Sequence, residues 1–211
     1  MTSLERPPRH NPVVHIVDDS EDLRRSLVFL FESVGIEALT YADATSFLAE
    51  FDPDEPAVVI VDIRMPGLSG FQLQERLLEL DYPAPLVFCS AHGDIPMSVR
   101  ALRHGAADFL EKPYQPQRML ELVQDQLLQA RRRFAAHARR TAVLRRLETL
   151  TQREREVLRH VIDGLPSQVI ARRLGASAKT VDVHRARIKA KTDSESLGSL
   201  VHDILLYEID V

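Results

Sequence analysis

Residues 57–67 read Ala-Val-Val-Ile-Val-Asp-Ile-Arg-Met-Pro-Gly, and this stretch decides the fold class. Its first five residues are apolar and mostly β-branched, as in a strand that is buried on both faces of a parallel sheet. Asp62 follows this strand directly, and Met65-Pro66-Gly67 is a turn signal. A helix is expected after the turn, because apolar residues recur at helical spacing between Phe71 and Leu80.

Short apolar runs on either side predict four more strands, at Val13–Val17, Ile36–Tyr41, Leu86–Cys89 and Asp108–Leu110. Segments with apolar residues at helical spacing lie between these strands. They are a helix that ends at Gly35, a short helix around Phe47 and a helix at Pro96–Arg103. This alternation predicts an α/β fold with five parallel strands and helices on both faces of the sheet.

Polar side chains follow several of these strands at the edge where ligands bind in such sheets. They are Asp18 and Asp19 after the first strand, Asp62 after the third, Ser90 after the fourth and Lys112 after the fifth. Carboxylates that converge repel each other by ~4 kcal/mol per pair at 4 Å and an effective dielectric near 20, so a cation is expected there. Mg²⁺ suits carboxylate oxygens, and the lysine and serine could hold the oxygens of a phosphoryl group on an aspartate.

Each of these residues also has an ordinary interpretation. Asp18, Asp19 or Ser20 could cap the next helix, Asp62 could face water, and Lys112 could be a surface lysine. Their occurrence together at one sheet edge favours the site. Cys89, the only cysteine, is interpreted as a small core residue rather than a redox sensor.

The 211 residues are 45% hydrophobic, and this length allows one large domain or two small ones. The longest apolar run is too short to span a membrane, and Met1–Pro12 lacks the apolar core of a secretory signal, so a cytoplasmic protein is expected. The net charge of −4 divides unevenly, with −10 on residues 1–122 and +6 on residues 123–211. Different partners are therefore expected for the two halves.

Residues 131–146 contain seven arginines and no acidic residue. A solvated basic linker helix that aids the encounter with DNA is the favoured interpretation, and direct contact with phosphates is the alternative. Apolar residues continue at a 3-4 spacing from Leu120 to Phe134. That is about two heptads, so a continuous helix is predicted while pairing between chains stays open.

The second half predicts four helices. Thr151 and Glu154 form a capping-box pattern, Ser167 is expected to cap a second helix, and Ser177 a third that reaches about Lys191. A last helix is expected at roughly Ser196–Ile209. A helix, a short glycine turn and a basic helix form the helix-turn-helix pattern, although a basic helical dimerisation module would look similar.

Four strings in the first half resemble the receiver domain of response regulators: V-D-D at 17–19, V-D-I-R-M-P-G-L-S-G at 61–70, S-A-H-G-D-I-P at 90–96 and G-A-A-D-F-L-E-K-P at 105–113. The resemblance implies a flavodoxin-like fold in which a sensor histidine kinase phosphorylates Asp62. It also implies that Asp19 and Asp62 bind Mg²⁺ (or Mn²⁺) directly with the backbone carbonyl of Arg64, and Asp18 mainly through water.

The same resemblance implies that Ser90 and Phe109 are a switch pair and that the Lys112–Pro113 bond is cis. Phe109 departs from the tyrosine that the family often has there, so its outward state lacks a tyrosine-type hydrogen bond. Inward movement of Ser90 toward a phosphoryl group would leave space for Phe109 and reshape the face of the fourth helix and fifth strand. Arg64 and His92 flank the site at positions that bear on phosphoryl lifetime.

The second half resembles the LuxR-type helix-turn-helix, through L-T-Q-R-E-R-E-V-L at 150–158, G-L-P-S-Q-V-I-A-R-R-L at 164–174 and T-V-D-V-H-R-A-R-I at 180–188. With the receiver, the whole chain is similar to FixJ-group response regulators. The motif would span Ser167–Ala186, with base-edge contacts from Asp182, Val183 and Ala186. Phosphate contacts would come from a second set of residues: Lys179, Thr180, Arg185, Arg187 and Lys191.

The expected organisation is therefore a receiver domain at 13–123, a basic helical linker at 124–146 and a DNA-binding domain at 147–211. The expected function is a transcription regulator, most often an activator in this group, that binds promoter DNA as a homodimer at least when phosphorylated. RNA polymerase is a candidate partner, and no membrane is involved.

Two other functions also fit parts of this sequence. A phosphatase with an aspartyl nucleophile is disfavoured, because Arg64 stands where a second Asp is needed, and no enzyme activity is expected. A phosphorylation-independent regulator that uses the receiver as a dimer scaffold is the other.

Overall fold

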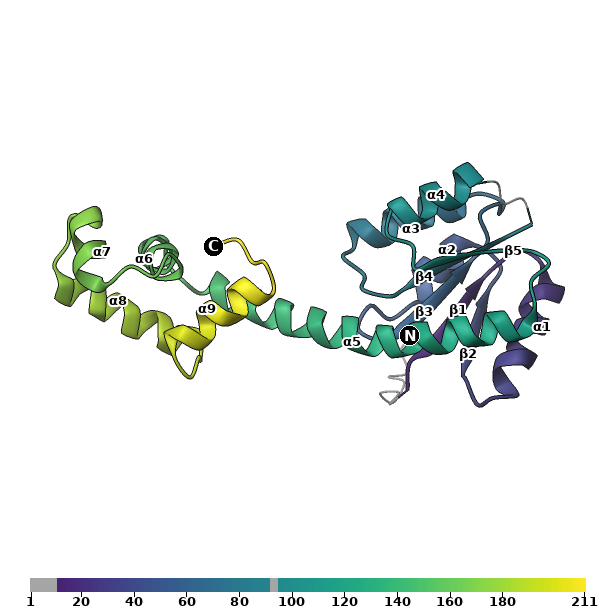
Figure 1. Cartoon of the computed structure of the whole chain (residues 1–211), viewed down its shortest axis with the longest axis horizontal. Helices are drawn as coiled ribbons and strands as arrows, with labels where there is room; N and C mark the ends of the chain where they lie inside the picture. Colours follow the sequence, from purple (N-terminus) through teal and green to yellow (C-terminus); the bar gives the residue numbers. More distant parts are fainter. Residues whose placement is uncertain (1–10, 92–94) are drawn as a thin grey trace, which may run out of the picture. The chain divides into compact units, whose positions relative to one another are not determined.

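The computed structural model describes residues 11–91 and 95–211, drawn in Figure 1. The chain divides into two compact units, Met1–Ala135 and Ala136–Val211. In the described parts of both units, no helix is long and apolar enough to cross a membrane.

The first unit contains one parallel sheet of five strands in the order β2-β1-β3-β4-β5, which is the flavodoxin-like order. The strands are β1 Val13–Val17, β2 Ala38–Tyr41, β3 Ala57–Val61, β4 Leu86–Ser90 and β5 Asp108–Glu111. All residues of the three central strands are buried, as the continuous apolar runs predicted. The predicted α/β fold class is confirmed.

Helices cover both faces of this sheet (Figure 1). They are α1 Glu21–Glu32, α2 Ala44–Glu50, α3 Gly70–Glu79, α4 Ile95–Arg103 and α5 Pro116–Glu148. One core lies under α1 and α5, and includes Leu27, Phe31 and Met119. The other lies under α2, α3 and α4, and includes Phe47, Leu73 and Ala101.

Several boundaries in the first unit differ by one or two residues from those predicted, and the start of β2 has a clear cause. β2 begins at Ala38 rather than Ile36, because the Ile36 N–H donates to the Phe31 carbonyl and so belongs to the turn that ends α1. α5 is one continuous helix of 33 residues, as the 3-4 spacing of apolar residues from Leu120 to Phe134 predicted. Phe134, within the predicted linker, is buried against Tyr82 in the first unit, with 5.5 Å between ring centroids.

Cys89 is fully buried in β4, and burial raises the pKa of its thiol to about 12. The thiolate that redox chemistry requires is therefore scarce at neutral pH. This environment supports the interpretation of Cys89 as a core residue.

The second unit is helical: the end of α5 is followed by α6 Gln152–Ile162, α7 Ser167–Leu174, α8 Ala178–Lys191 and α9 Leu197–Leu206. The predicted capping box at the start of α6 is confirmed, since Thr151 and Glu154 exchange both hydrogen bonds. Val157, Ile170 and Leu200 belong to its shared core.

Two predictions in this unit were wrong. Ser167 does not cap α7: Pro166 is the N-cap residue, and the Ser167 hydroxyl instead donates to the Asp182 carboxylate at 2.7 Å. The last helix ends at Leu206 rather than Ile209, because Glu208 has a positive φ of 50° and turns the chain. Ile209 is then buried in the core outside the helix.

Candidate functional site

The strand ends bring the predicted polar residues of the first unit together. Val17 pairs with Val61, so β1 and β3 end together, and β4 continues two residues beyond Phe88, the partner of Val61. A hollow of about 330 Å³ opens there. Its lining includes every side chain that the sequence placed at this edge: Asp18, Asp19, Asp62, Ser90 and Lys112, together with Ser20, Leu23, Arg64 and Ala91.

The loop after β3 is held tightly against α3. The Gly70 N–H donates to the Ile63 carbonyl at 3.0 Å. A Cβ atom at Gly70 would lie 2.3 Å from the Asp62 carbonyl oxygen, which no side chain can accommodate without a shift of the backbone. Glycine is therefore required for α3 to begin this close to Asp62.

Lys112 joins two of the carboxylates. Its Nζ lies 2.6 Å from Asp18 Oδ2 and 3.5 Å from Asp62 Oδ1. Its own backbone N–H donates to the Ser90 carbonyl, and the Lys112–Pro113 bond is cis, as expected. All three side chains are largely buried, with 16%, 3% and 10% of the lysine, Asp18 and Asp62 side chains exposed. The ammonium group therefore compensates a negative charge that water scarcely reaches.

Burial and charge act in opposite directions on these groups. Burial raises the pKa of Asp62, and the neighbouring Asp18 charge raises it further, while Lys112 partly lowers it. Burial alone would lower the pKa of Lys112, but the hydrogen bond to Asp18 and the charges of Asp18 and Asp62 together outweigh burial and raise it. Lys112 is therefore a firmly protonated cation beside Asp62.

The donor atoms fit a hard divalent cation. Asp62 Oδ1 is buried and accepts no hydrogen bond, whereas Asp18 Oδ1 accepts from the Ser20 N–H. The atoms near Asp62 that could ligate a metal are oxygens, which Mg²⁺ and Mn²⁺ prefer. In the described parts of the chain, no three His, Cys, Asp or Glu side chains already gather as a metal-binding group. The unsatisfied Asp62 oxygen is the atom that most favours a cation here.

The predicted switch pair lies on neighbouring strands. Ser90 is 1% exposed at the end of β4, and Phe109 on β5 pairs with Phe88, two residues before Ser90. Side chains two residues apart share a face of a strand, so Ser90 and Phe109 lie on the same face. Phe109 is half-buried and packs against the core under α2, α3 and α4. His92, which flanks the site in sequence, lies outside the described residues.

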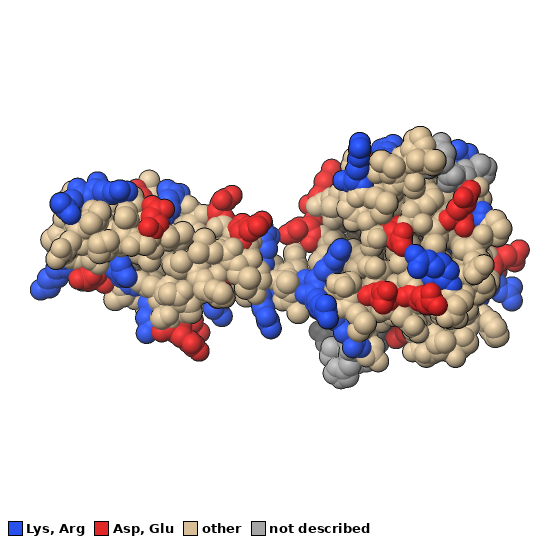
Figure 2. Space-filling view, in the orientation of Figure 1, with Lys and Arg blue, Asp and Glu red and all other residues tan. Residues whose placement is uncertain are grey.

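In the second unit, α7 and α8 form the predicted helix-turn-helix. Gly175 ends α7 in the left-handed conformation, with a φ of 61°. Val181 and Ile188 anchor α8 in the core. The opposite side of α8 is exposed, and it carries most of the predicted DNA contacts: Lys179, Thr180, Asp182, Val183, Ala186 and Arg187, with Arg185 half-buried. Figure 2 shows basic side chains over α7, where Arg172 and Arg173 are exposed.

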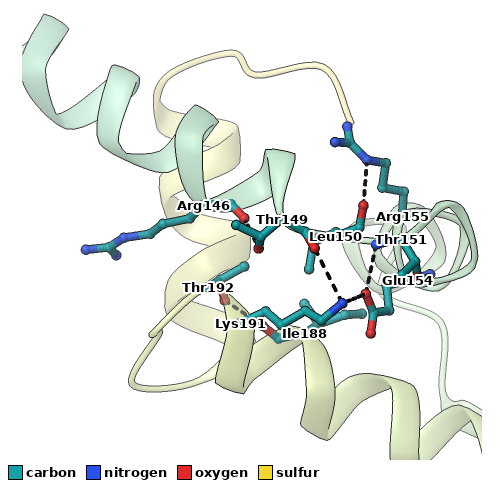
Figure 3. Close-up of polar contacts among 9 residues, drawn as sticks. All are labelled: Arg146, Thr149, Leu150, Thr151, Glu154, Arg155, Ile188, Lys191 and Thr192. Carbon is teal, nitrogen blue, oxygen red and sulfur yellow. Dashed lines mark hydrogen bonds and ion pairs between the residues drawn. The ribbon is translucent and has the colours of Figure 1, made fainter.

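Lys191 differs from the other predicted phosphate contacts, because its ammonium group has internal partners (Figure 3). Its Nζ lies 2.7 Å from Glu154 Oε2 and donates to the Thr149 carbonyl at 3.4 Å. The Glu154 side chain is only 3% exposed and also accepts from the Thr151 N–H at 2.8 Å. Lys191 therefore ties the end of α8 to the start of α6, a role that its sequence position did not indicate.

Comparison with known families agrees with this arrangement. Residues 14–124 match the response regulator receiver domain, and residues 148–202 match the bacterial regulatory proteins of the luxR family. Nodulation protein W of Bradyrhizobium diazoefficiens is 39% identical over 90% of this chain and 83% of its own length. The transcriptional regulatory protein FixJ of Rhizobium meliloti is 40% identical over 89% of this chain and 92% of its own.

Solved structures show the same combination. The response regulator StyR is 39% identical to this chain, with a TM-score of 0.70. The match covers 93% of this chain and 100% of the StyR chain. Full-length FixJ from B. japonicum is 32% identical, covers 95% of this chain and 98% of its own, and has a TM-score of 0.53. The chain therefore belongs to the FixJ group of DNA-binding response regulators, with a receiver domain followed by a LuxR-type helix-turn-helix domain.

Proposed function

We propose that a sensor histidine kinase transfers a phosphoryl group to Asp62, and that this modification controls promoter binding by the helix-turn-helix domain. The observation that carries the proposal is the environment of Asp62 Oδ1, a buried oxygen without a hydrogen bond, 3.5 Å from the Lys112 ammonium. An oxygen without a hydrogen-bond partner is available to form a new bond, and a nearby cation favours the charge that a phosphoryl group brings.

In the transfer step, an Asp62 carboxylate oxygen forms a bond to phosphorus while the bond between phosphorus and the donor nitrogen of the kinase histidine breaks. Lys112 then holds one phosphoryl oxygen, and the Ser90 hydroxyl, at the end of the neighbouring strand, donates to another. A Mg²⁺ or Mn²⁺ ion, held by Asp19, Asp62 and the Arg64 carbonyl with Asp18 beyond a water, would neutralise the remaining oxygen charge.

The consequence of phosphorylation would follow from the switch pair. Movement of Ser90 toward the phosphoryl group vacates space on the face of the sheet that Phe109 shares. Phe109 would rotate into that space, and the face formed by α4 and β5 would change. We infer that this face then favours a homodimer, in which two copies of α8 bind adjacent half-sites about one turn of DNA apart.

Within that homodimer, exposed residues of α8 would bind DNA. Asp182, Val183 and Ala186 would meet base edges, and Lys179, Thr180, Arg185 and Arg187 would favour phosphates. Lys191 is left out of this set, because Glu154 and the Thr149 carbonyl hold its ammonium group. We propose that the regulator acts in the cytoplasm and activates transcription, with RNA polymerase as a candidate partner. No catalytic turnover of its own is proposed.

Incubation with acetyl phosphate and Mg²⁺ tests the chemistry. Intact-mass spectrometry of the full chain should show one added phosphoryl group, and Asp62→Asn should show none. Asp19→Asn should retain the acceptor but react more slowly, because it removes one metal oxygen. An unmodified wild-type chain would refute the phosphoryl-acceptor role and favour a receiver that serves as a dimer scaffold.

A further inference from the structure

A buried amide joins α3 to the end of α4. The Gln74 side chain is 4% exposed, and its Nε2 donates to the Ala101 carbonyl at 3.3 Å and to the His104 carbonyl at 3.0 Å. A buried amide is costly to leave without hydrogen bonds. Both N–H groups of the Gln74 amide bond to carbonyls at the C-terminal end of α4, so both donors of this buried side chain are used in joining α3 to α4.

The C-terminal end of α4 is the part of that helix that needs donors. The last carbonyls of a helix have no partner from a following turn. Here the Ala101 carbonyl accepts from the Ala106 N–H at 3.1 Å, and Gly105 leaves the helix with a φ of 87°. Gln74 thus adds two hydrogen bonds from another helix to the C-terminal end of α4, where Gly105 already turns the chain.

Arg100 adds a second connection to the same helix. Its guanidinium lies 4.3 Å from the centre of the Phe71 ring and 3.6 Å from Glu75 Oε1, and about half of its side chain is exposed. Water screens such a pair, so its contribution is modest. The buried Gln74 amide is the stronger of the two connections between α3 and α4, which lie side by side in Figure 1.

α3 provides a fixed reference for α4. Its first residue, Gly70, is pressed against the Asp62 carbonyl, and its Phe71 ring lies 5.1 Å from the Phe88 ring of β4. The outer face of α4 is free, with Ile95 81%, Val99 40% and Leu102 48% exposed. α4 is therefore attached to α3 near its C-terminal end, while much of its outer apolar surface has no partner within the described first unit.

We propose that Gln74 is a positioning residue for the switch, and that its two hydrogen bonds hold the last turn of α4 in the resting arrangement. This inference rests on the proposed function, in which a phosphoryl group on Asp62 changes the face of α4 and β5. A ligand shifts such an equilibrium only through its differential affinity for the two states. Hydrogen bonds present only in the resting state therefore weaken the binding of any ligand that requires the active state.

Gln74→Met tests the proposal, because methionine keeps the unbranched shape and removes both donors. The full chain with saturating Mg²⁺ is titrated calorimetrically with beryllium fluoride, which mimics a phosphoryl group on aspartate. The dissociation constant should fall by about tenfold, the effect of losing two hydrogen bonds from one state only. Glu79→Gln, an exposed change on the same helix, should leave the constant within about twofold of wild type.

A purely structural role gives a different result. If Gln74 stabilises both states equally, Gln74→Met lowers the melting temperature and leaves the beryllium fluoride affinity unchanged, and the proposal is wrong. Weaker binding by this variant also contradicts it, because the hydrogen bonds would then belong to the active state.

A measurement on the wild type needs no stable variant. Amide hydrogen exchange across residues 101–106 should become faster when beryllium fluoride binds, and unchanged or slower exchange refutes the proposal. Failure of the wild type to bind beryllium fluoride, or equal binding by Asp62→Asn, would instead remove the proposed function and this inference with it. The two failures are distinguishable, because only the second abolishes the Asp62-dependent binding of beryllium fluoride to the wild type.

Discussion

Replacement of Lys191 is predicted to destabilise the DNA-binding unit from within. In Lys191→Met, the Glu154 carboxylate would lose the ammonium 2.7 Å away while its side chain stays 3% exposed. Loss of one partner from a buried charged hydrogen bond costs about 2 kcal/mol. Part of the lysine is exposed, at 36% of its side chain, and Glu154 keeps the Thr151 N–H, so we expect a cost below the range of about 3–5 kcal/mol for broken buried pairs.

Native-state hydrogen exchange of the full chain measures this cost locally. A loss of about 2 kcal/mol corresponds to roughly 30-fold faster exchange of the most protected amides in α6 and α8. Lys189→Met is the matched control, because Lys189 is an exposed lysine on the same helix. Equal exchange in the two variants would refute a structural role for Lys191. In the double variant Lys191→Met/Glu154→Gln, most of the protection should return, since no buried charge is left unpaired.

The same pair makes the unit sensitive to acid. Burial alone would raise the pKa of Glu154, but hydrogen bonds from Lys191 and Thr151 outweigh burial and lower it below its usual value of 4.5. A carboxyl group with a lowered folded-state pKa contributes stability above its unfolded pKa and loses it as the pH falls through the folded value. The protection of α6 should therefore fall in wild type below about pH 4.5, and Glu154→Gln should show a flatter profile there.

Three further predictions concern the acceptor site and DNA binding. Lys112→Met should slow phosphoryl transfer from acetyl phosphate by roughly 100-fold, measured by intact mass against time, because it removes a positioned cation; a rate within about threefold of wild type would contradict this role. Gly70→Ala should destabilise the receiver by about 2 kcal/mol in urea unfolding. Gly198→Ala is the control and should not destabilise the protein, because its Cβ would meet only Ser196 Oγ at 3.6 Å. Equal unfolding midpoints for the two variants would refute the close approach at Asp62. Lys179→Gln should reduce the salt dependence of DNA binding by about one counterion in titrations at several salt concentrations, and an unchanged slope would exclude a phosphate contact.

The parts of the structure that were predictable have local or periodic causes. The apolar run Ala57–Val61 predicts a buried strand. Parallel strands place their carboxyl ends at one edge of a sheet, so the sequence alone predicts that Asp18, Asp62 and Ser90 lie together. The capping box at Thr151 and Glu154 is a three-residue pattern, and it was confirmed.

The parts that were missed depend on distant contacts. Gln74 bonds to residues 27 and 30 positions away, and Lys191 to a carboxylate 37 positions away. No periodicity connects such residues, so Lys191 resembled any other basic residue on a DNA-binding helix. Ser167 was assigned as a cap because serine favours that position, but Asp182, 15 residues away, accepts its hydroxyl instead.

Light scattering is the direct test of whether phosphorylation chemistry at Asp62 controls dimer assembly. The molar mass of the wild-type chain is measured with Mg²⁺, before and after addition of beryllium fluoride, alongside Asp62→Asn. We expect the mass of the wild type to rise from monomer to dimer and the mass of Asp62→Asn to stay unchanged. An unchanged mass in both proteins would contradict the proposed phosphoryl-dependent dimer.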